Sequence, residues 1–287
     1  MSAVLDQLVS LLALERLEED LFRGQSQDLG WGVVFGGQVL GQALAAATQT
    51  VPPERHAHSL HAYFLRPGDV SRPIVYDVDR IRDGGSFNTR RVVAIQRGAA
   101  IFNLDASFQL PEEGFSHQDP KPEAPPPLTV PSEQERYAPF AALVQSPLRE
   151  RILSERPFEL RIVGAPHPLK PAVAPPTAAV WLRAQGTLPD DAALHRSLLA
   201  YVSDYAFLGT ALRPHGVSWL TPGMQVASLD HAIWFHRPFR VDDWLLHTMD
   251  SPSAHGARGL VRGSIFDQAG RLVASTAQEG LMRFRQG

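Results

Sequence analysis

Two stretches of the chain carry apolar residues at helical spacing, and each is followed by runs in which apolar and polar residues alternate. The first stretch spans Gln38 to Thr50 and the second about Leu194 to Leu212. The alternating runs are Ile74–Ile81, Arg90–Gln96 and Ile101–Leu110 in the first half, and Ala232–Phe239, Trp244–Ser251, Ala257–Phe266 and Leu272–Phe284 in the second. A long helix followed by several antiparallel strands predicts, in each half, a sheet wrapped around one helix.

The two halves also share sequence motifs in the same order. Residues 63–67 read Tyr-Phe-Leu-Arg-Pro, and residues 234–238 read Trp-Phe-His-Arg-Pro. Each motif is followed by a turn rich in glycine and serine and by two alternating runs, which end near Gln109 and Gln278. Matched blocks in one order, at nearly constant spacing, indicate a duplication. We expect the two sheets to pair through their edge strands.

Proline separates the two halves. It is dense in residues 111–131 and again in residues 165–176. Because proline lacks an amide donor and fixes φ, both segments are expected to be extended linker, with a short helical candidate at about Ser132 to Ser154 between them. The expected division is an N-terminal repeat in residues 1–115, a linker in 116–176 and a C-terminal repeat in 177–287.

Composition narrows the function classes. The 287 residues have a formal net charge of −3, which gives no reason to expect nucleic acid or an anionic membrane as a partner. No apolar run approaches the ~20 residues of a membrane span, and acidic Asp6 without a basic flank argues against a secretory signal. The absence of cysteine excludes disulfides, thiolate metal sites and a cysteine nucleophile. We therefore expect a soluble, cytoplasmic, globular protein.

Asp204 stands out among the polar residues. Its neighbours at helical spacing are apolar or aromatic, namely Ala200, Tyr201, Phe207 and Leu208. A carboxylate on such a face is unfavourable unless it is hydrogen-bonded, and burial raises its pKa toward the range of a general base. An aspartate that caps a nearby loop amide fits the pattern equally well. Gln278 also lies on a largely apolar strand face, where an amide satisfying a sheet edge is the alternative.

Other chemistries fit less well. Ser228 is followed by Asp230 and His231, but adjacent strand residues point to opposite faces and no G-x-S-x-G motif occurs, so a Ser-His-Asp triad is disfavoured. The histidines of this part, His231 and His236, are expected at the surface or at strand ends, and no metal-binding spacing occurs. Gly36-Gly37 is either a plain turn or a helix start whose amides stabilise an oxyanion.

These residues lie in motifs that resemble the bacterial acyl-CoA thioesterase II family. The similar segments fall between Leu5 and Arg283 and are Gly24-Gln25, Phe35-Gly36-Gly37-Gln38, residues 58–69, 188–191, Asp204, Asp230-His231, residues 234–239 and 275–280. The resemblance implies an α+β double hotdog fold, in which each of two fused repeats wraps an antiparallel sheet around a long helix. It also implies a catalytic set that maps by motif to Asp204, Ser228 and Gln278. The family commonly has Thr where this chain has Ser228, and both supply a hydroxyl.

The implied activity is hydrolysis of fatty acyl-CoA to a free fatty acid and CoA, with Asp204 as the base and Ser228 and Gln278 orienting a water. The resemblance implies no cofactor and no metal. It implies a homo-oligomer, a dimer or tetramer, because hotdog sheets commonly pair further. The alternatives are a non-catalytic acyl-CoA-binding protein and a hotdog enoyl-CoA hydratase, which needs a histidine that does not lie near Asp204 in the sequence. Candidates for contacts with CoA phosphates are Arg66, Arg90, Arg91, Arg237 and Arg258.

Overall fold

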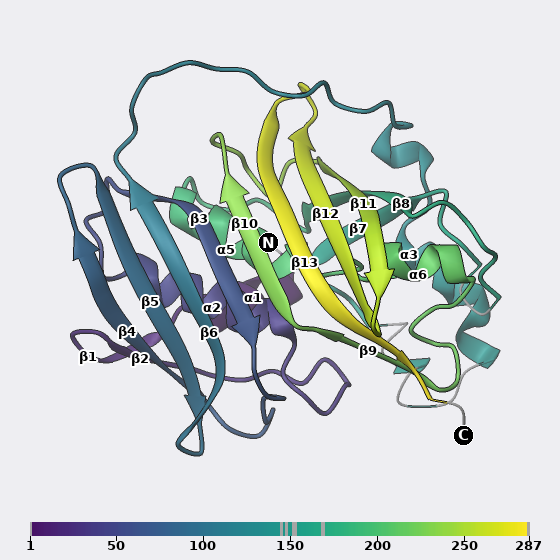
Figure 1. Cartoon of the computed structure of the whole chain (residues 1–287), viewed down its shortest axis with the longest axis horizontal. Helices are drawn as coiled ribbons and strands as arrows, with labels where there is room; N and C mark the ends of the chain where they lie inside the picture. The colour runs from purple at the N-terminus through teal and green to yellow at the C-terminus, as the bar shows by residue number, and fades with distance from the viewer. Residues whose placement is uncertain (1, 144–145, 147–148, 151–153, 168–169, 286–287) are drawn as a thin grey trace.

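A computed structural model of the chain describes residues 2–143, 146, 149–150, 154–167 and 170–285 (Figure 1). The first half contains two helices and six strands within these ranges. The helices are α1 (Ala3–Leu12) and α2 (Gly36–Thr48), and the strands are β1 (Glu15–Glu18), β2 (Leu21–Gly24), β3 (His56–Phe64), β4 (Ile74–Asp83), β5 (Phe87–Gln96) and β6 (Ala99–Gln109). The predicted helix and the three predicted alternating runs of this half are confirmed.

The second half repeats this order after a connecting segment. Its helices are α5 (Ala192–Ser203) and α6 (Gly209–Leu212), and its strands are β7 (Phe158–Val163), β8 (Thr177–Ala184), β9 (Met224–Ser228), β10 (Asp230–Phe235), β11 (Leu245–His255), β12 (Arg258–Asp267) and β13 (Leu272–Phe284). A short helix α3 (Glu133–Tyr137) and 3-10 turns at Pro127–Thr129, Ala138–Leu143 and Arg213–His215 complete the described elements.

All thirteen described strands join one antiparallel sheet. Its order is β1-β2-β4-β5-β6-β3-β10-β13-β12-β11-β8-β7, with β9 paired to the end of β13. The two halves meet where β3 lies beside β10, with Leu60 opposite Ile233 in the register (Figure 1). The predicted pairing of the two sheets through an edge strand is therefore confirmed.

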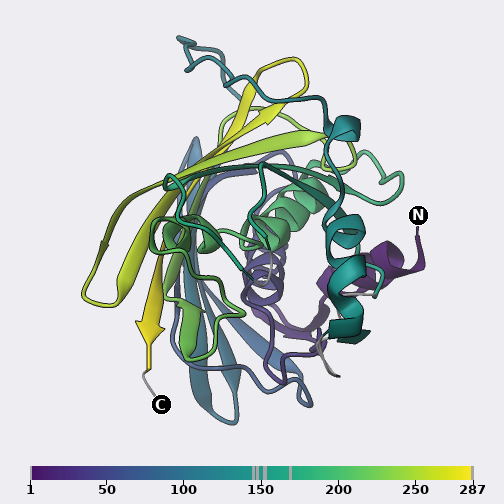
Figure 2. The same ribbon diagram turned by 90° about the vertical axis from the view of Figure 1, so that its right-hand side faces the viewer.

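The two long helices lie side by side within the curve of the sheet (Figure 2). They run antiparallel, because Gly37 of α2 faces the Tyr201 carbonyl of α5 while Gly41 faces the Ser197 carbonyl. The N-terminus of α2 thus meets the C-terminus of α5. This brings residues of both repeats together at one end of the helix pair.

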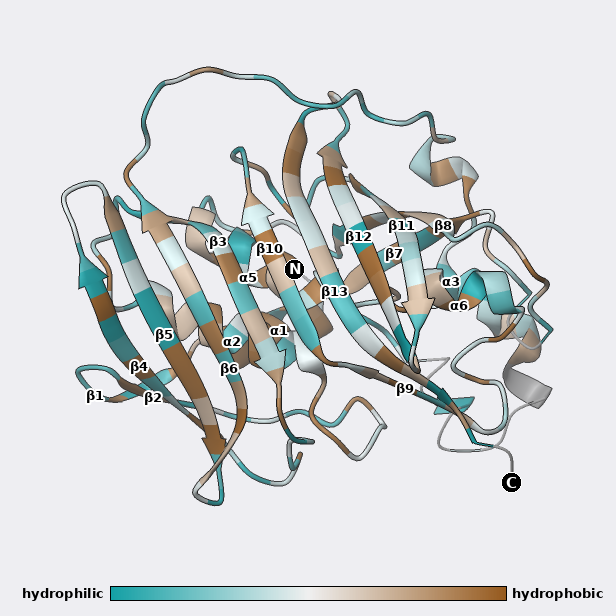
Figure 3. Cartoon of the chain, viewed as in Figure 1, coloured by the Kyte–Doolittle hydropathy of each residue, from teal (hydrophilic) through white to brown (hydrophobic). Residues whose placement is uncertain are grey.

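Hydrophilic and hydrophobic residues alternate along the strands (Figure 3), and the buried apolar ones pack with the helices to form the core. In β12, Val261 and Ile265 are fully buried, whereas Leu260 of the same strand is 37% exposed on the outer face, although β12 lies between β11 and β13. Burying one such aliphatic side chain contributes roughly 1.5–3 kcal/mol, so the apolar inner face stabilises the wrapped arrangement. No helix in the part of the chain that the structure describes is long and apolar enough to span a membrane.

The segment expected to be an extended linker contains a strand of the sheet. Residues 111–126 run without helix or strand, as expected, but β7 lies within 116–176 and pairs with β8. Phe158 and Leu160 alternate as buried residues of β7, a short pattern that the surrounding prolines obscure in the sequence. Of the helical candidate Ser132–Ser154, α3 and the 3-10 turn at Ala138–Leu143 are present, and residues 144–145, 147–148 and 151–153 lie outside the described residues.

Candidate active site

Asp204 lies at the C-terminal cap of α5 and not in a helix interior. The predicted helix Leu194–Leu212 is wrong in this respect, because α5 ends at Ser203 and α6 is separate. Ala206 adopts a left-handed backbone with φ 58°, which breaks the helical hydrogen-bond ladder and which apolar spacing does not reveal. The C-terminal end of a helix carries partial negative charge and gives a carboxylate no support. The donors to Asp204 must therefore come from other elements.

Two of these donors are the other predicted site residues. The Ser228 hydroxyl donates to Asp204 Oδ1 at 3.0 Å, and Gln278 Nε2 donates to the same oxygen at 3.1 Å. Gln278 Nε2 also lies 2.7 Å from Ser228 Oγ, to which it donates. The structure therefore brings the three residues together in one closed triangle of hydrogen bonds. Ser228 pairs with Asp204 and not with a histidine, so the residues do not form a Ser-His-Asp triad.

The sheet explains how Ser228 and Gln278 meet. Ser228 ends β9, where it is the register partner of Gly280 in β13. Gln278 precedes Gly280 by two positions, so both project toward the same face of the strand. Thr276 and Gln278 are buried, whereas the alternate residues Ser275 and Glu279 are partly exposed. Gln278 is therefore an inward-facing polar side chain, as the alternation predicts.

The first repeat contributes the start of α2. Gly36-Gly37 begins α2 and is therefore not a plain turn, and the Gly37 amide donates to the Asp204 carboxylate; a role of these amides in stabilising an oxyanion stays a prediction. A Cβ on Gly36 would lie 2.7 Å from Asp204 Oδ2, and one on Gly37 would lie 2.1 Å from the Tyr201 carbonyl oxygen. Both glycines are thus required by close approach of the two helices.

Burial raises the pKa of Asp204 from 3.8 to about 6, while the hydrogen bonds from Ser228, Gln278 and Gly37 act in the opposite direction. The result is a carboxylate that is ionised near neutral pH and still basic enough to accept a proton. An aspartate with this environment is a candidate general base.

His231 also belongs to this site; it lies near the start of β10, one of the two positions expected from the sequence, but it is buried and not at the surface. It is 1% exposed, its Nδ1 lies 2.5 Å from Gln278 Oε1 and its Nε2 lies 2.9 Å from Ser203 Oγ. Burial lowers the pKa of His231 to about 4, so the ring is neutral. The signal that could have placed it is alternation, because His231, Ile233 and Phe235 share the inner face of β10. His236 is exposed, as expected.

The predicted phosphate-binding arginines divide into two groups. Arg90 is 1% exposed and donates to Thr50, to the Arg82 carbonyl and to Asp83, so its assignment to a CoA phosphate is wrong. A buried guanidinium needs such internal acceptors, and alternation along β5 points it inward. The other four remain predictions, namely Arg66, Arg91, Arg237 and Arg258.

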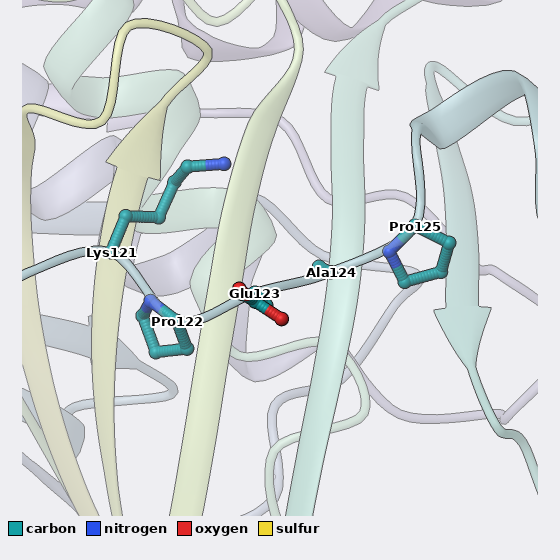
Figure 4. Close-up of a pocket in the computed structure, with 5 residues that line it drawn as sticks. All are labelled: Lys121, Pro122, Glu123, Ala124 and Pro125. Atoms are coloured by element: carbon teal, nitrogen blue, oxygen red, sulfur yellow. The ribbon is translucent and has the colours of Figure 1, made fainter.

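Two cavities of about 610 Å³ each lie away from Asp204. One is bounded by the connecting segment Lys121–Pro125, which crosses the strands of the second half (Figure 4). The other lies at the opposite end of the helix pair and is lined by the C-terminus of α2 and the N-terminus of α5. Neither contains Ser228 or Gln278. Among the described residues, no three His, Asp or Glu side chains are grouped as metal ligands.

Two family models match the chain. A model described as the acyl-CoA thioesterase N-terminal domain matches residues 26–109, and one described as acyl-CoA thioesterase matches residues 148–281. The acyl-CoA thioesterase 2 of Haemophilus influenzae is 46% identical over 286 residues, covering 100% of both chains.

Solved structures give the same relationship. An acyl-CoA thioesterase II of Mycobacterium marinum is 44% identical with a TM-score of 0.79, covering 98% of this chain and 99% of that one. A hotdog-fold protein of unknown function from Alicyclobacillus acidocaldarius, 21% identical with a TM-score of 0.77, covers 98% of this chain and 99% of its own. The second likeness concerns the fold alone. Together with the two repeats, each of which wraps its part of the continuous sheet around a long helix, it confirms the double hotdog prediction.

Proposed function

The chain belongs to the acyl-CoA thioesterase family and hydrolyses acyl-CoA, and we propose that Asp204 is the general base of this reaction, with Ser228 and Gln278 orienting the attacking water. The observation that carries the proposal is the hydrogen-bonded triangle around a carboxylate whose pKa burial raises to about 6. We propose fatty acyl-CoA as the substrate class.

The reaction needs one base and an oriented water. Asp204 accepts a proton as the water oxygen attacks the thioester carbonyl carbon, which gives a tetrahedral intermediate. Collapse of the intermediate breaks the C–S bond, and the proton that Asp204 took from the water passes to the departing CoA sulfur. The products are a carboxylic acid and CoA, and Asp204 is restored as the carboxylate after the proton leaves it.

Ser228 and Gln278 keep the base in one orientation. Both donate to Asp204 Oδ1, which leaves Oδ2, on the side of Gly36, as the oxygen for the water, so Ser228 and Gln278 orient the water through the carboxylate that they fix. Fixing the geometry of base and water converts an encounter of separate groups into an intramolecular step. The buried His231, held between Ser203 and Gln278, is not placed to act on substrate as the histidine of a hydratase does.

We propose that the repeats 1–115 and 177–287, joined by 116–176, act as one catalytic unit. The support is that Gly37 of the first repeat donates to Asp204 of the second. Neither half therefore holds the complete arrangement of donors around the base.

We further propose a cytoplasmic location and a homo-oligomer, a dimer or tetramer. A cysteine-free chain fits a reducing compartment. The outer face of the central strands exposes aromatic side chains, with Tyr63 of β3 60% exposed and Trp234 of β10 36% exposed, which suits an association surface. Light scattering after size-exclusion chromatography measures the assembly.

The test is release of free thiol from acyl-CoA by the purified full-length chain, followed with a thiol-reactive dye. Asp204→Asn should lower kcat by about 1,000-fold, in the range that a general base contributes. Asp267→Asn is the matched control, because Asp267 is also buried but pairs with Arg271 at the far end of β12. Full turnover by Asp204→Asn would contradict the base assignment, and no thiol release by the unchanged chain would contradict the activity.

A further inference from the structure

We propose that His231 is a positioning residue for the hydrolysis, because it fixes the direction of the Gln278 carboxamide so that the amide NH₂ faces Asp204 and Ser228. This inference rests on the role proposed above for Gln278. His231 acts on Asp204 through Gln278, which bonds His231 with its amide oxygen and Asp204 with its amide nitrogen.

The need for such a residue follows from the shape of a carboxamide. Rotation by 180° exchanges the oxygen and nitrogen of Gln278 with almost no change in volume. In the rotated form, the Gln278 oxygen would face Asp204 Oδ1 about where the nitrogen now lies, 3.1 Å away, and both donations to Asp204 and Ser228 would be lost. An acceptor facing a carboxylate is repelled, so the working orientation is the one with nitrogen toward Asp204.

His231 stabilises that orientation from the other side. Its Nδ1 lies 2.5 Å from Gln278 Oε1, so an Nδ1–H donates to the amide oxygen. A neutral imidazole has one N–H, and the Nδ1–H tautomer leaves Nε2 as an acceptor. Ser203 Oγ lies 2.9 Å from Nε2 and also 2.9 Å from the Ala200 carbonyl oxygen, so in this tautomer its single hydrogen goes to Nε2 and the Ala200 carbonyl is the competing acceptor. Donors then run in one direction from Ser203 through His231 and Gln278 to Asp204.

Packing keeps the imidazole in place. His231 is 1% exposed, and its ring lies edge-on to Phe207 at 5.7 Å between centroids. The ring has no room to be hydrated, which agrees with its lowered pKa. The ring therefore stays neutral, keeps a single tautomer and directs one donor at Gln278.

The first repeat shows which residues occupy the positions equivalent to His231 and Gln278 in a half that has no counterpart of Asp204. Alignment of the two aromatic motifs puts Leu60 at the position of His231, and Leu60 is fully buried. Gln109, the motif counterpart of Gln278, instead donates to Glu112 at the protein surface. The buried histidine and the inward amide thus occur together in the half that carries Asp204.

The experiment measures kcat and KM by thiol release for His231→Leu, His231→Asn and Gln278→Ala, alone and combined. His231→Leu should lower kcat about tenfold with KM within about twofold, since one donor to a buried acceptor is lost. His231→Asn retains an amide donor near the Nδ1 position and should keep more than about a third of kcat. His231→Phe, which keeps the ring volume, replaces His231→Leu if the leucine variant does not fold.

The combined variant distinguishes positioning from general stability. If His231 acts through Gln278, His231→Leu with Gln278→Ala should be no slower than Gln278→Ala alone. His247→Leu is the matched control, because His247 is also buried and packs on Phe207 but contacts Thr276. It should lower the thermal midpoint and leave kcat within about threefold.

Three outcomes would overturn the inference. They are unchanged kcat in His231→Leu, multiplied losses in the combined variant, and a kcat loss in His247→Leu equal to that in His231→Leu. If Gln278→Ala retains full kcat, the proposed role of Gln278 fails as well. If Gln278→Ala is slow while His231→Leu is fast, only the role of His231 fails.

Discussion

The two ends of the antiparallel helix pair have the same architecture and different chemistry. At one end, α2 begins with Gly36-Gly37 and meets the Asp204 cap of α5; at the other, α5 begins with Ala192-Ala193 near the C-terminus of α2. Each end carries an aspartate. Asp191 is exposed and caps its own helix by accepting from the Ala193 and Leu194 amides, whereas Asp204 is held by donors from other elements.

The difference between the two aspartates separates a structural helix cap from a carboxylate available for chemistry. Asp191 occupies a helix N-terminus, where amides and the helix dipole both favour a carboxylate. Asp204 occupies a C-terminus, and burial further disfavours its charge. A carboxylate that is placed against the preferences of its helix, and is then satisfied by Ser228, Gln278 and Gly37, is the one available for catalysis. On the proposed mechanism, the duplication is thus structural at both ends and catalytic at one.

The largest loss of stability and activity in this comparison is expected from substituting Gly37, at the contact between the helices of the two repeats. In Gly37→Ala, the new Cβ would lie 2.1 Å from the Tyr201 carbonyl oxygen and 2.4 Å from a ring carbon of Phe35. The helices must separate, which should destabilise the fold by about 3 kcal/mol and lower kcat at least about 100-fold by displacing Asp204. Denaturant unfolding and thiol release measure the two effects.

The opposite end supplies the control for Gly37→Ala. Ala193→Gly removes the methyl group at the start of α5 and should cost less than about 1 kcal/mol, with kcat within about twofold. Equal losses from the two substitutions would show that the helix starts are equivalent and would contradict the division of roles.

A smaller loss of kcat is expected from substituting Gln278, and none from substituting its motif counterpart Gln109. Gln278→Ala removes the donor to both Asp204 and Ser228 and should lower kcat about 30-fold, since buried acceptors lose their partner. Gln109→Ala removes the motif counterpart, which donates to Glu112 outside the site, and should leave kcat unchanged. Initial rates of thiol release at saturating acyl-CoA give kcat for both variants. A loss of activity in Gln109→Ala would mean that the first repeat is catalytic as well.

Alternation and internal repetition were enough to predict most of the sheet. The strands β4, β5, β6, β11, β12 and β13 follow the alternating runs, because each has one face on the core and one outside. The duplication predicted that the two halves pair through edge strands, and the structure shows these to be β3 and β10, although β3 was not among the predicted runs. Strand β7 was hidden because its six residues lie between proline-rich segments, which argue for linker when only composition is read.

The candidate site was predictable by motif but not in its connections. Asp204, Ser228 and Gln278 could be named, yet Gly37 and Asp204 lie in different repeats, and no local pattern reports that one donates to the other. The end of α5 depended on the left-handed Ala206, a conformation that alanine rarely adopts. His231 was missed because nearness to Asp204 was judged along the chain, whereas the sheet brings β10 beside β13.

The smallest of the three effects in this comparison is the pH dependence of the buried carboxylate. Asp204 acts as a base only when ionised, and its pKa lies at about 6 because of burial. We therefore expect kcat/KM to be level above pH 7 and to fall about tenfold by pH 5, with a limiting slope of one. Buffers of constant ionic strength and a thiol probe that works at acidic pH give the profile. A profile that stays level to pH 5 would exclude an Asp204 base with this pKa.

The same ionisation has the opposite consequence for the fold. Because the pKa of Asp204 is raised from 3.8 in the unfolded chain to about 6 in the folded one, its contribution to stability is present at pH 3 and is lost as pH rises through 6. The loss is at most about 3 kcal/mol. Asp204→Asn removes this dependence, so its unfolding free energy should gain on that of the unchanged chain between pH 4 and pH 7. A constant difference between the two chains would mean that Asp204 is not buried as a carboxylate, and that its end of the helix pair resembles the end marked by Asp191.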